Sequence, residues 1–396
     1  MNQRIKKFAI FLLLWHLFPL QIIAQDIRFK HLNDNNGLSQ NLVLSIVQDQ
    51  EGFMWFGTKD GLNKYDGYQF TVYQNEPNNP NSVSSNYITE LFMDRNGKLW
   101  VGTENGILNI YNAASQSFER ISLPITQSKN KNSEVINTIT QDKTGDIWLG
   151  TFGNGLYRIP FLNEQHELTK IKQYSNDSSG KQQLCSNIIK KIFIDDRGII
   201  WIGTEKGLNR MDPKTASISS FYFDVKHPDA LGSDTDFSVS AIDKADDFHL
   251  WLGTRSGLVK FNTVNNSFKI FPHHLNIFRY GWGEINDIVQ DRQGELWLAT
   301  PGELMRFNTK TLKYSSVKND PLIPESISFN GISSLFFDRT NILWIGTSGM
   351  GIDYYDPKAN RFGFLKRKIM SGSRVAGFSI RSVLEESERY VWISAE

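Results

Sequence analysis

Tryptophan recurs at a near-constant interval along this chain, and that interval constrains the fold more than any other feature. Eight of the ten tryptophans are 45 to 53 residues apart, at positions Trp55, Trp100, Trp148, Trp201, Trp251, Trp297, Trp344 and Trp392. The other two, Trp15 and Trp282, lie outside the series. A period of this length predicts an array of supersecondary units, each too small to bury its hydrophobic face alone.

Each unit has the pattern of a small antiparallel sheet. In the first unit, four short apolar-rich runs lie at residues 45–49, 53–58, 62–66 and 70–73, separated by turns that contain Gly, Asp or Asn. Such runs predict four strands, and no window has a useful helical period. The second run is apolar on both faces, which is expected for a strand that is covered by another sheet on each side. The pattern therefore predicts an all-β fold, a β-propeller with four-stranded antiparallel blades.

Two further positions repeat with the tryptophans. Glycine lies two residues after Trp in six of the first seven units, and Ala299 replaces it in the other, which suits close approach between backbones. Aspartate lies six residues before Trp in six units, and we expect its carboxylate to accept backbone N–H groups across a hairpin turn. Calcium is the alternative role, but each loop supplies too few carboxylates for the six to eight oxygen ligands that calcium takes. The fifth unit departs from this pattern at residues 243–247, where a longer turn is expected.

The number of units predicts seven blades. Fourth-strand runs appear at residues 70–73, 118–121, 268–271 and 362–365, and residues 27–32 have the same character. We expect residues 27–32 to complete the last blade, because a closed ring leaves no exposed sheet edge. The predicted ring covers residues 25–365. Residues 379–384 and 390–393 resemble the first two strands of an eighth unit, so residues 366–396 are expected to begin a second propeller, and the chain to be part of a longer protein.

The N-terminus and the composition limit the location and the partners. Basic residues precede an apolar run of about eleven residues and a small residue, Ala24, which predicts a cleaved signal peptide at residues 1–24. An uncleaved anchor is the alternative, but the run is short of the ~20 residues that span a bilayer. The 43 Lys and Arg balance 42 Asp and Glu, which argues against nucleic-acid binding. The single cysteine, Cys185, excludes an internal disulfide and a zinc site built from several thiolates.

The string Asp-x-x-Gly-x-x-Trp-x-Gly-Thr-x-x-Gly-Leu, which runs from Asp49 to Leu62, closely resembles the two-component-regulator propeller repeat. The resemblance extends over nearly all of residues 27–396. It implies the periplasmic sensor region of a hybrid two-component system, typical of gut Bacteroidetes. Members carry two seven-bladed rings, a β-sandwich, a membrane helix and a histidine kinase, usually followed by receiver and helix-turn-helix modules. The resemblance implies that they sense breakdown products of complex glycans.

No catalytic motif is recognisable in the chain. The sequence lacks a P-loop, Gly-x-Gly-x-x-Gly, His-Glu-x-x-His and Gly-x-Ser-x-Gly, and its seven histidines have no metal-ligand spacing. We therefore predict neither an enzyme nor a metal or other cofactor for this chain. A propeller lyase remains an alternative, because the fold alone does not exclude it.

A ligand site can be placed by strand parity. In an up-and-down blade, the turns between strands two and three emerge on the same face of the ring as the connections between blades. That face would combine charged groups with aromatic rings, which suits a sugar. The candidate ligand-binding residues there are Lys59, Glu104, Phe152, Glu205, Arg255, Arg279, Tyr280 and Trp282. The alternative is that these residues form solvated turns.

The repeat pattern and the signal sequence, taken with the family resemblance, imply a ligand-sensing propeller for an oligosaccharide, periplasmic after signal cleavage, in a parent protein that is anchored in the inner membrane. The partners that the resemblance implies are the second propeller and the β-sandwich of the parent, with a possible homodimer, and ligand affinity for one arrangement of these parts would drive signalling. An interaction scaffold without a small-molecule site is the alternative from another class.

Overall fold

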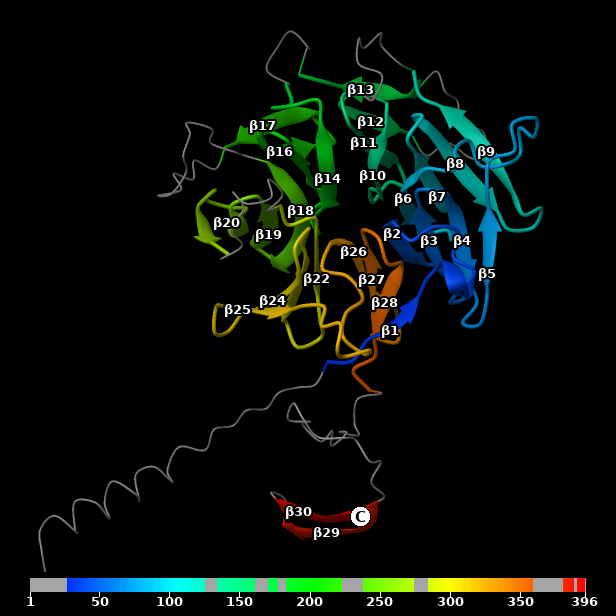
Figure 1. The fold of residues 1–396 in the computed structure, drawn as a ribbon. Coiled ribbons are helices and arrows are strands. Elements are labelled where there is room, and N and C mark those ends of the chain that lie inside the picture. Colours follow the sequence, from blue (N-terminus) through cyan, green and yellow to red (C-terminus); the bar gives the residue numbers. More distant parts are fainter. Residues whose placement is uncertain are drawn as a thin grey trace, which may run out of the picture. The chain divides into compact units, whose positions relative to one another are not determined.

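Seven sheets surround a common centre (Figure 1). The computed structural model describes residues 27–124, 134–160, 170–176, 183–222, 238–273, 284–358, 380–387 and 390–395. The chain divides into two compact units, Met1–Lys358 and Ala359–Glu396. In the first unit every sheet has four antiparallel strands, which confirms the predicted all-β propeller with seven blades. No α-helix occurs in the part of the chain that the structure describes.

The blades are numbered in chain order, and the first strand of each lies nearest the centre. Blade 1 contains β2 (Val43–Gln48), β3 (Met54–Thr58), β4 (Gly61–Tyr65) and β5 (Phe70–Tyr73). Blade 2 contains β6 (Ile88–Met93), β7 (Leu99–Thr103), β8 (Ile107–Asn112) and β9 (Ser117–Ser122). Blade 3 contains β10 (Ile136–Gln141), β11 (Ile147–Thr151), β12 (Leu156–Ile159) and β13 (Lys172–Tyr174). Blade 4 contains β14 (Ile189–Ile194), β15 (Ile200–Thr204), β16 (Gly207–Asp212) and β17 (Ser217–Phe221).

The remaining blades follow the same order until the last. Blade 5 contains β18 (Val239–Asp246), β19 (His249–Thr254), β20 (Gly257–Asn262) and β21 (Phe268–Phe271). Blade 6 contains β22 (Asp287–Gln290), β23 (Leu296–Ala299), β24 (Leu304–Asn308) and β25 (Lys313–Val317). Blade 7 contains β26 (Ile332–Phe337), β27 (Leu343–Thr347), β28 (Ile352–Tyr355) and the N-terminal β1 (Lys30–Leu32). A short 3-10 turn, η1 (Asp34–Asn36), connects β1 to blade 1.

The N-terminal strand closes the ring, as predicted. β1 pairs antiparallel with β28, with His31 opposite Asp353. It occupies the fourth-strand position of blade 7, and residues 362–365, also considered a fourth strand, lie outside the described residues. The predicted boundary at residue 365 also lies outside them.

The spacing between aspartate and tryptophan has a direct cause. In blade 2, Oδ1 of Asp94 accepts the backbone N–H groups of Asn96 and Lys98, each at 2.9 Å, as the turn prediction required. The other oxygen, Oδ2, accepts the indole N–H of Trp100 at 3.0 Å, so one carboxylate fastens both the turn and the ring. The same indole bond occurs in blades 1, 3, 4 and 7. The turn of blade 7 has Asn341 in place of glycine, in the left-handed region with φ of 71°.

The repeated glycines lie where neighbouring blades touch. A Cβ atom on Gly57 of blade 1 would lie 2.8 Å from Cγ2 of Ile88, the first residue of the next inner strand. The equivalent glycine meets the first residue of the next inner strand in blades 2, 3, 4 and 7, and Ile285 just before β22 in blade 5. Blade 7 thereby packs against Val43 of blade 1. The predicted close approach is confirmed, and it is an approach between blades.

Blade 5 corrects the expectation of a longer turn. β18 and β19 extend toward each other until Asp246 pairs with His249, so only residues 247 and 248 connect them. In blade 1 the last register pair is Gln48 with Met54, with five residues between. Without the aspartate turn, the strands are longer and the connection is shorter.

The second unit contains one described hairpin, β29 (Ile380–Ser387) and β30 (Tyr390–Ala395). Leu384 pairs with Trp392, and the register shifts between Ile380 and Ser382 and again between Glu385 and Ser387. Blade 5 has the same arrangement, in which Asp243 pairs with Trp251 and the shifts lie between Val239 and Ala241 and between Lys244 and Asp246. The two predicted strands are confirmed, and they have the register of the first two strands of a blade.

Candidate functional site

Five of the sequence-predicted ligand residues occupy one equivalent position in blades 1 to 5. Each follows the threonine that ends the second strand, and each is exposed: Lys59, Glu104, Phe152, Glu205 and Arg255. In blades 1 to 4, the backbone N–H group of this residue donates to the carbonyl oxygen of the residue that precedes the first strand of the same blade. Because adjacent blades pack in the same orientation, these positions form a circle on one face of the ring, which we call the hairpin face.

The preceding threonine fixes the shape of each turn. In blade 4, the hydroxyl of Thr204 donates to the carbonyl oxygen of Gly207 at 3.0 Å and accepts the N–H of Lys206 at 3.1 Å. The same pair of bonds occurs in blades 1 and 5. The conserved geometry holds the backbone while the next side chain is left to vary between blades.

The other three predicted residues, Arg279, Tyr280 and Trp282, lie outside the described residues. The hairpin face also exposes apolar side chains that the sequence analysis did not propose for the site, among them Phe329 and Met350. Phe329, in the connection before β26, is 40% exposed, and Met350, in the β27–β28 turn, is 47% exposed. Strand parity places the turn that holds Met350 on this face, and the same reasoning would have placed Phe329 there.

Four of the connections between blades are clamped by a side chain of the third strand. Oδ1 of Asn63 accepts the N–H of Ser39 at 2.9 Å, and Asn109 and Asn209 hold Ser84 and Cys185 in the same way. In blade 7 the clamp is a carboxylate, because Oδ2 of Asp353 accepts the N–H of Ser328 at 2.8 Å. Blades 3, 5 and 6 have Tyr157, Val259 and Met305 at this position, which cannot form the clamp.

Asp353 also connects the clamp to ring closure. Its Oδ1 lies 2.5 Å from Nδ1 of His31, the residue opposite on β1. The Nε2 atom of His31 contacts the carbonyl oxygen of Pro324 at 2.9 Å. The hydrogen bond from Asp353 raises the pKa of His31, although burial opposes it.

The inner strands are joined by a repeated latch. In six of the seven, the register shifts after the first residue, which makes the second residue a bulge. In blades 2, 3 and 7 the bulge side chain donates to the backbone carbonyl of the first residue of the next inner strand, as with Asn137 and Ile189 at 2.8 Å. In blades 1 and 3 the third residue accepts an N–H from the fourth residue of that strand, as with Thr138 and Ile192 at 3.3 Å. These two bonds define the inner latch.

Blade 4 lacks both bonds of the inner latch, and blade 5 has only the first, in which Ser240 donates to the carbonyl oxygen of Ile285 at 2.9 Å. The two latch positions of β14 hold Lys190 and Lys191, and a lysine ammonium has no acceptor. The ammonium nitrogen of Lys190 instead lies 3.1 Å from each carboxylate oxygen of Glu284, just before β22, so it reaches past blade 5 to blade 6. Lys191 also points toward blade 6, with its ammonium nitrogen 4.0 Å from Oδ1 of Asp287. Burial raises the pKa of Glu284, but Lys190 and Ser238 outweigh it and hold that pKa below its ordinary value.

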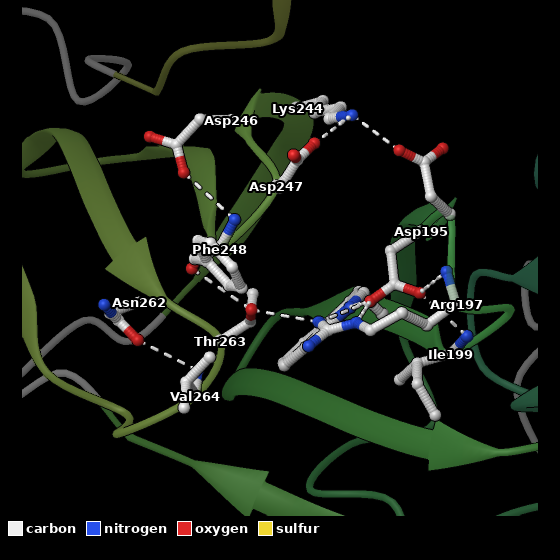
Figure 2. Close-up of polar contacts among 12 residues, drawn as sticks. Asp195, Arg197, Ile199, Lys244, Asp246, Asp247, Phe248, Asn262, Thr263 and Val264 are labelled. Atoms are coloured by element: carbon white, nitrogen blue, oxygen red, sulfur yellow. Dashed lines mark hydrogen bonds and ion pairs between the residues drawn. The ribbon is translucent and has the colours of Figure 1, made fainter.

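Charged contacts also connect blades 4 and 5 at the face opposite the hairpin face. The ammonium of Lys244 in blade 5 lies 3.0 Å from Asp247, as Figure 2 shows. It also lies 2.5 Å from Asp196 of blade 4. In the same view, Arg197 is held by Asp195 at 2.7 Å and donates to the hydroxyl of Thr263 in blade 5 at 2.9 Å. A cavity of about 370 Å³ lies between these groups.

The centre of the ring is a polar cavity of about 420 Å³, lined by the inner strands of all seven blades. Glu90, Lys191 and Asp287 line it from blades 2, 4 and 6. Burial raises the pKa of Glu90 to about 7, and Asp287 adds to this while Lys191 opposes it. Burial likewise raises the pKa of Asp243 to about 6. Burial lowers the pKa of Lys191, but Asp287, Glu90 and Asp243 outweigh it and hold that pKa above its ordinary value.

The sequence analysis did not identify this axial cavity. A signal was present, because inner strands are mostly apolar and yet Glu90, Lys191 and Asp287 each lie ten residues before the repeated tryptophan of their own blade. Within the described ranges, no group of three or more His, Cys, Asp or Glu side chains is arranged to hold a metal ion. The described residues also include no helix that is long and apolar enough to cross a membrane.

Comparison with protein families identifies the repeat. A model described as two component regulator propeller matches six segments of the chain, residues 37–60, 82–105, 130–153, 183–206, 280–302 and 326–349. These segments end in the second strands or the turns that follow them in blades 1, 2, 3, 4, 6 and 7. Blade 5, whose first turn departs from the pattern, is not among them.

The chain is similar to part of larger signalling proteins. It is 28% identical over 338 residues to histidine kinase P4 of Formosa agariphila. The aligned region covers 82% of this chain and 23% of that protein. The solved extracellular domain of the putative hybrid two component system BT3049 from B. thetaiotaomicron matches 93% of this chain with a TM-score of 0.71 and 24% identity. The chain spans 46% of that domain, and thus less than half of it.

The fold is shared more widely. Virginiamycin B lyase from Staphylococcus aureus, solved with quinupristin, matches 83% of this chain and 99% of its own, with a TM-score of 0.61 and 17% identity. At that identity the likeness shows the fold alone. None of these comparisons indicates a catalytic domain within this chain. The six matched segments identify the chain as one built from two component regulator propeller repeats.

Proposed function

We propose that this chain is the N-terminal ligand-sensing propeller of a hybrid two-component sensor and that it binds an oligosaccharide on the hairpin face. The observation that carries the proposal is the circle of exposed side chains at one equivalent position in blades 1 to 5. Fixed backbones present two carboxylates, two cations and an aromatic ring, which together suit the hydroxyl, sulfate and C–H surfaces of a sugar. The sequence-predicted Arg279, Tyr280 and Trp282 belong to the same proposed site.

The proposed setting follows from the sequence. Cleavage of residues 1–24 would release the chain into the periplasm, and the parent protein would be anchored in the inner membrane. The relatives are longer than this chain, which supports the proposal that a second propeller follows, beginning with the β29–β30 hairpin, and then a β-sandwich. Ligand binding would shift the arrangement of these parts, in a dimer if the parent forms one.

Calorimetric titration of the purified chain against neutral and sulfated oligosaccharides tests the proposal, with product analysis of each mixture. We expect saturable binding without turnover, weakened about tenfold by Trp282→Ala or Arg255→Ala, because charge-assisted hydrogen bonds and aromatic packing contribute at that level. Arg95→Ala is the matched control, since Arg95 is an exposed arginine of the opposite face. Absence of binding would favour the scaffold alternative, and a new product would favour a lyase.

A further inference from the structure

The side chain of His31 connects three segments of the ring. His31 lies on β1, and its Nδ1 atom lies 2.5 Å from Oδ1 of Asp353 on β28. Its Nε2 atom lies 2.9 Å from the carbonyl oxygen of Pro324, in the connection between blades 6 and 7. A carboxylate oxygen and a carbonyl oxygen accept hydrogen bonds and do not donate them. A neutral imidazole carries one N–H group, so only the protonated ring makes both contacts together.

His249 in blade 5 provides an internal comparison. Its Nδ1 atom lies 2.7 Å from Oδ1 of Asp246, but its Nε2 atom lies 3.1 Å from the amide nitrogen of Asn262. The orientation of that amide follows from its oxygen, which accepts the backbone N–H groups of Val264 and Asn265. The amide nitrogen therefore donates to Nε2, and one proton on Nδ1 satisfies both contacts of His249. The two histidine–aspartate pairs differ by one proton.

Asp353 ties the contact of His31 to the rest of blade 7. Asp353 is fully buried, and its other oxygen accepts the backbone N–H and the hydroxyl of Ser328 at 2.8 and 3.0 Å. A buried carboxylate that loses its cationic partner destabilises the fold, because its charge remains shielded from water. Loss of one proton from His31 removes that cation and one of the two donors. The pairing of β1 with β28, which has only three residue pairs, is weakened as a result.

The charged groups around His31 favour its protonated form. Asp353 faces it from β28, and Glu325 acts on it from the connection between blades 6 and 7. Lys30, the next residue on β1, points to the other side of the strand, with its ammonium 5.7 Å from the centroid of the Tyr354 ring. The hydrogen bond to Asp353 and the charges of the two carboxylates raise the pKa of His31, although burial opposes them.

We propose that His31 is a pH-dependent lock of the ring, whose protonated side chain holds both β28 and the connection between blades 6 and 7 against β1. The same connection presents Phe329 on the hairpin face, and its carbonyl oxygen at Glu325 accepts the N–H of Phe29 at 2.8 Å. Because folding favours the protonated state, the lock is complete below the ordinary histidine pKa of 6.5 and opens as the pH rises through the raised value. The lock does not depend on the proposed oligosaccharide site.

Hydrogen exchange of the purified full chain, read by mass spectrometry at about pH 6 and about pH 8.5, tests the lock. Rates are corrected for the intrinsic pH dependence of exchange, and blade 3 is the reference because its four strands contain no histidine. We expect the protection of β1 and β28, relative to blade 3, to fall about tenfold at the higher pH, because a charged hydrogen bond is lost. A change in global stability, such as that from Glu90, alters both blades alike.

Two variants of His31 and one control sharpen the test. His31→Gln has no titrating group, so the protection of β1 and β28 should be low at both pH values. His31→Arg keeps a positive charge and several donors at both pH values, so their protection should stay high. His249→Gln is the matched control and should keep the tenfold fall, because His249 lies in blade 5.

Either of two results would overturn the proposal. The first is that the protection of β1 and β28 in the unmodified chain changes no more than that of blade 3. The second is that the fall persists in His31→Gln. The first result is obtained without a substitution, so the test stays decisive if a variant does not fold.

Discussion

The junction between blades 3 and 4 and the junction between blades 4 and 5 join the same kinds of strand by different chemistry. At the first, Asn137 and Thr138 form both bonds of the inner latch with Ile189 and Ile192, and neither partner is charged. At the second, both latch bonds are missing, and lysines reach past blade 5 to Glu284 and Asp287. Lys244 and Arg197 then connect the two blades at the opposite face.

The neutral contacts and the charged contacts therefore stabilise the ring in different ways. A neutral hydrogen bond to a backbone carbonyl of the next strand fixes which blade lies next and at what height, and it is insensitive to salt. Ion pairs between blades 4 and 6 connect two parts of the ring that are not neighbours. The strength of these ion pairs depends on pH, salt and bound ions. The charged junction is therefore the part of the ring on which solution conditions can act.

A methyl group added at the repeated glycine of each junction should give the largest loss of stability. The two losses show whether both junctions are closely packed. A Cβ atom at Gly150 would lie 2.4 Å from Cγ2 of Ile189, and one at Gly203 would lie 2.5 Å from the backbone oxygen of Val239. We expect Gly150→Ala to lower the free energy of unfolding by about 2 kcal/mol and Gly203→Ala by about 3 kcal/mol, because a backbone atom yields less than a side chain. Urea unfolding measures both.

The control for these variants is Ala299→Gly. Blade 6 already accommodates a methyl group at this position, and Ala299 is fully buried. Its loss should cost about 1 kcal/mol through cavity formation and backbone freedom. Equal stability of Gly203→Ala and the unmodified chain would contradict the close packing at the charged junction.

Protonation of Glu90 should give the next largest effect, which is a pH dependence of the free energy of unfolding. Its pKa is raised from 4.5 to about 7 in the folded chain, so the folded state takes up a proton that the unfolded state releases. The free energy of unfolding should therefore rise as the pH falls from 8 to 5, by up to about 3 kcal/mol from this group. Glu90→Gln should remove that part of the pH dependence in urea unfolding at both pH values. His31, whose raised pKa acts in the same direction, remains in both proteins.

The two kinds of link should then differ in salt dependence. Asn137→Ala leaves the carbonyl of Ile189 without its side-chain donor and should cost about 1–2 kcal/mol at any salt concentration. Lys190→Met leaves Glu284 without its cation and should cost about as much at low salt, because the pair is partly accessible to solvent. In 1 M sodium chloride the second cost should shrink and the first should not. Identical responses to salt would remove the distinction between the junctions.

Lys244→Gln should have the smallest effect. Its ammonium contacts Asp196 across the junction and Asp247 within blade 5, but all three side chains are well exposed to solvent. Exposed ion pairs contribute little to stability, so the unfolding midpoint should stay within experimental error. A clear loss of stability would mean that the contacts in Figure 2 hold the junction more strongly than their exposure implies.

The fold could be predicted because its determinants are local and repeated. The tryptophan period, the glycine after it and the aspartate before it each act within one unit or between adjacent units. The indole bond to aspartate was missed, although the constant six-residue spacing contained it. The short connection in blade 5 was missed because the loss of a turn motif does not indicate whether strands extend or a loop grows.

The site was less accessible to sequence reasoning. Parity located the five exposed residues of the hairpin face, but whether they bind a ligand remains a prediction, and Arg279, Tyr280 and Trp282 lie outside the described residues. The axial cavity depends on side chains about 100 residues apart, such as Glu90, Lys191 and Asp287. Their meeting requires the ring to close, and no single repeat contains that information.

Closure by β1 has a consequence for the order in which the molecule can be completed. The strand made first pairs with one made more than 300 residues later, since His31 and Asp353 are 322 positions apart. Joining ends across so long a loop costs entropy, and contacts of such long range slow folding. Six blades can assemble from their own strands as they emerge, whereas β1 has no partner until β28 has been made, more than 300 residues later. Until then both flanks of the nascent array are open, and a chaperone has the whole of that interval in which to act.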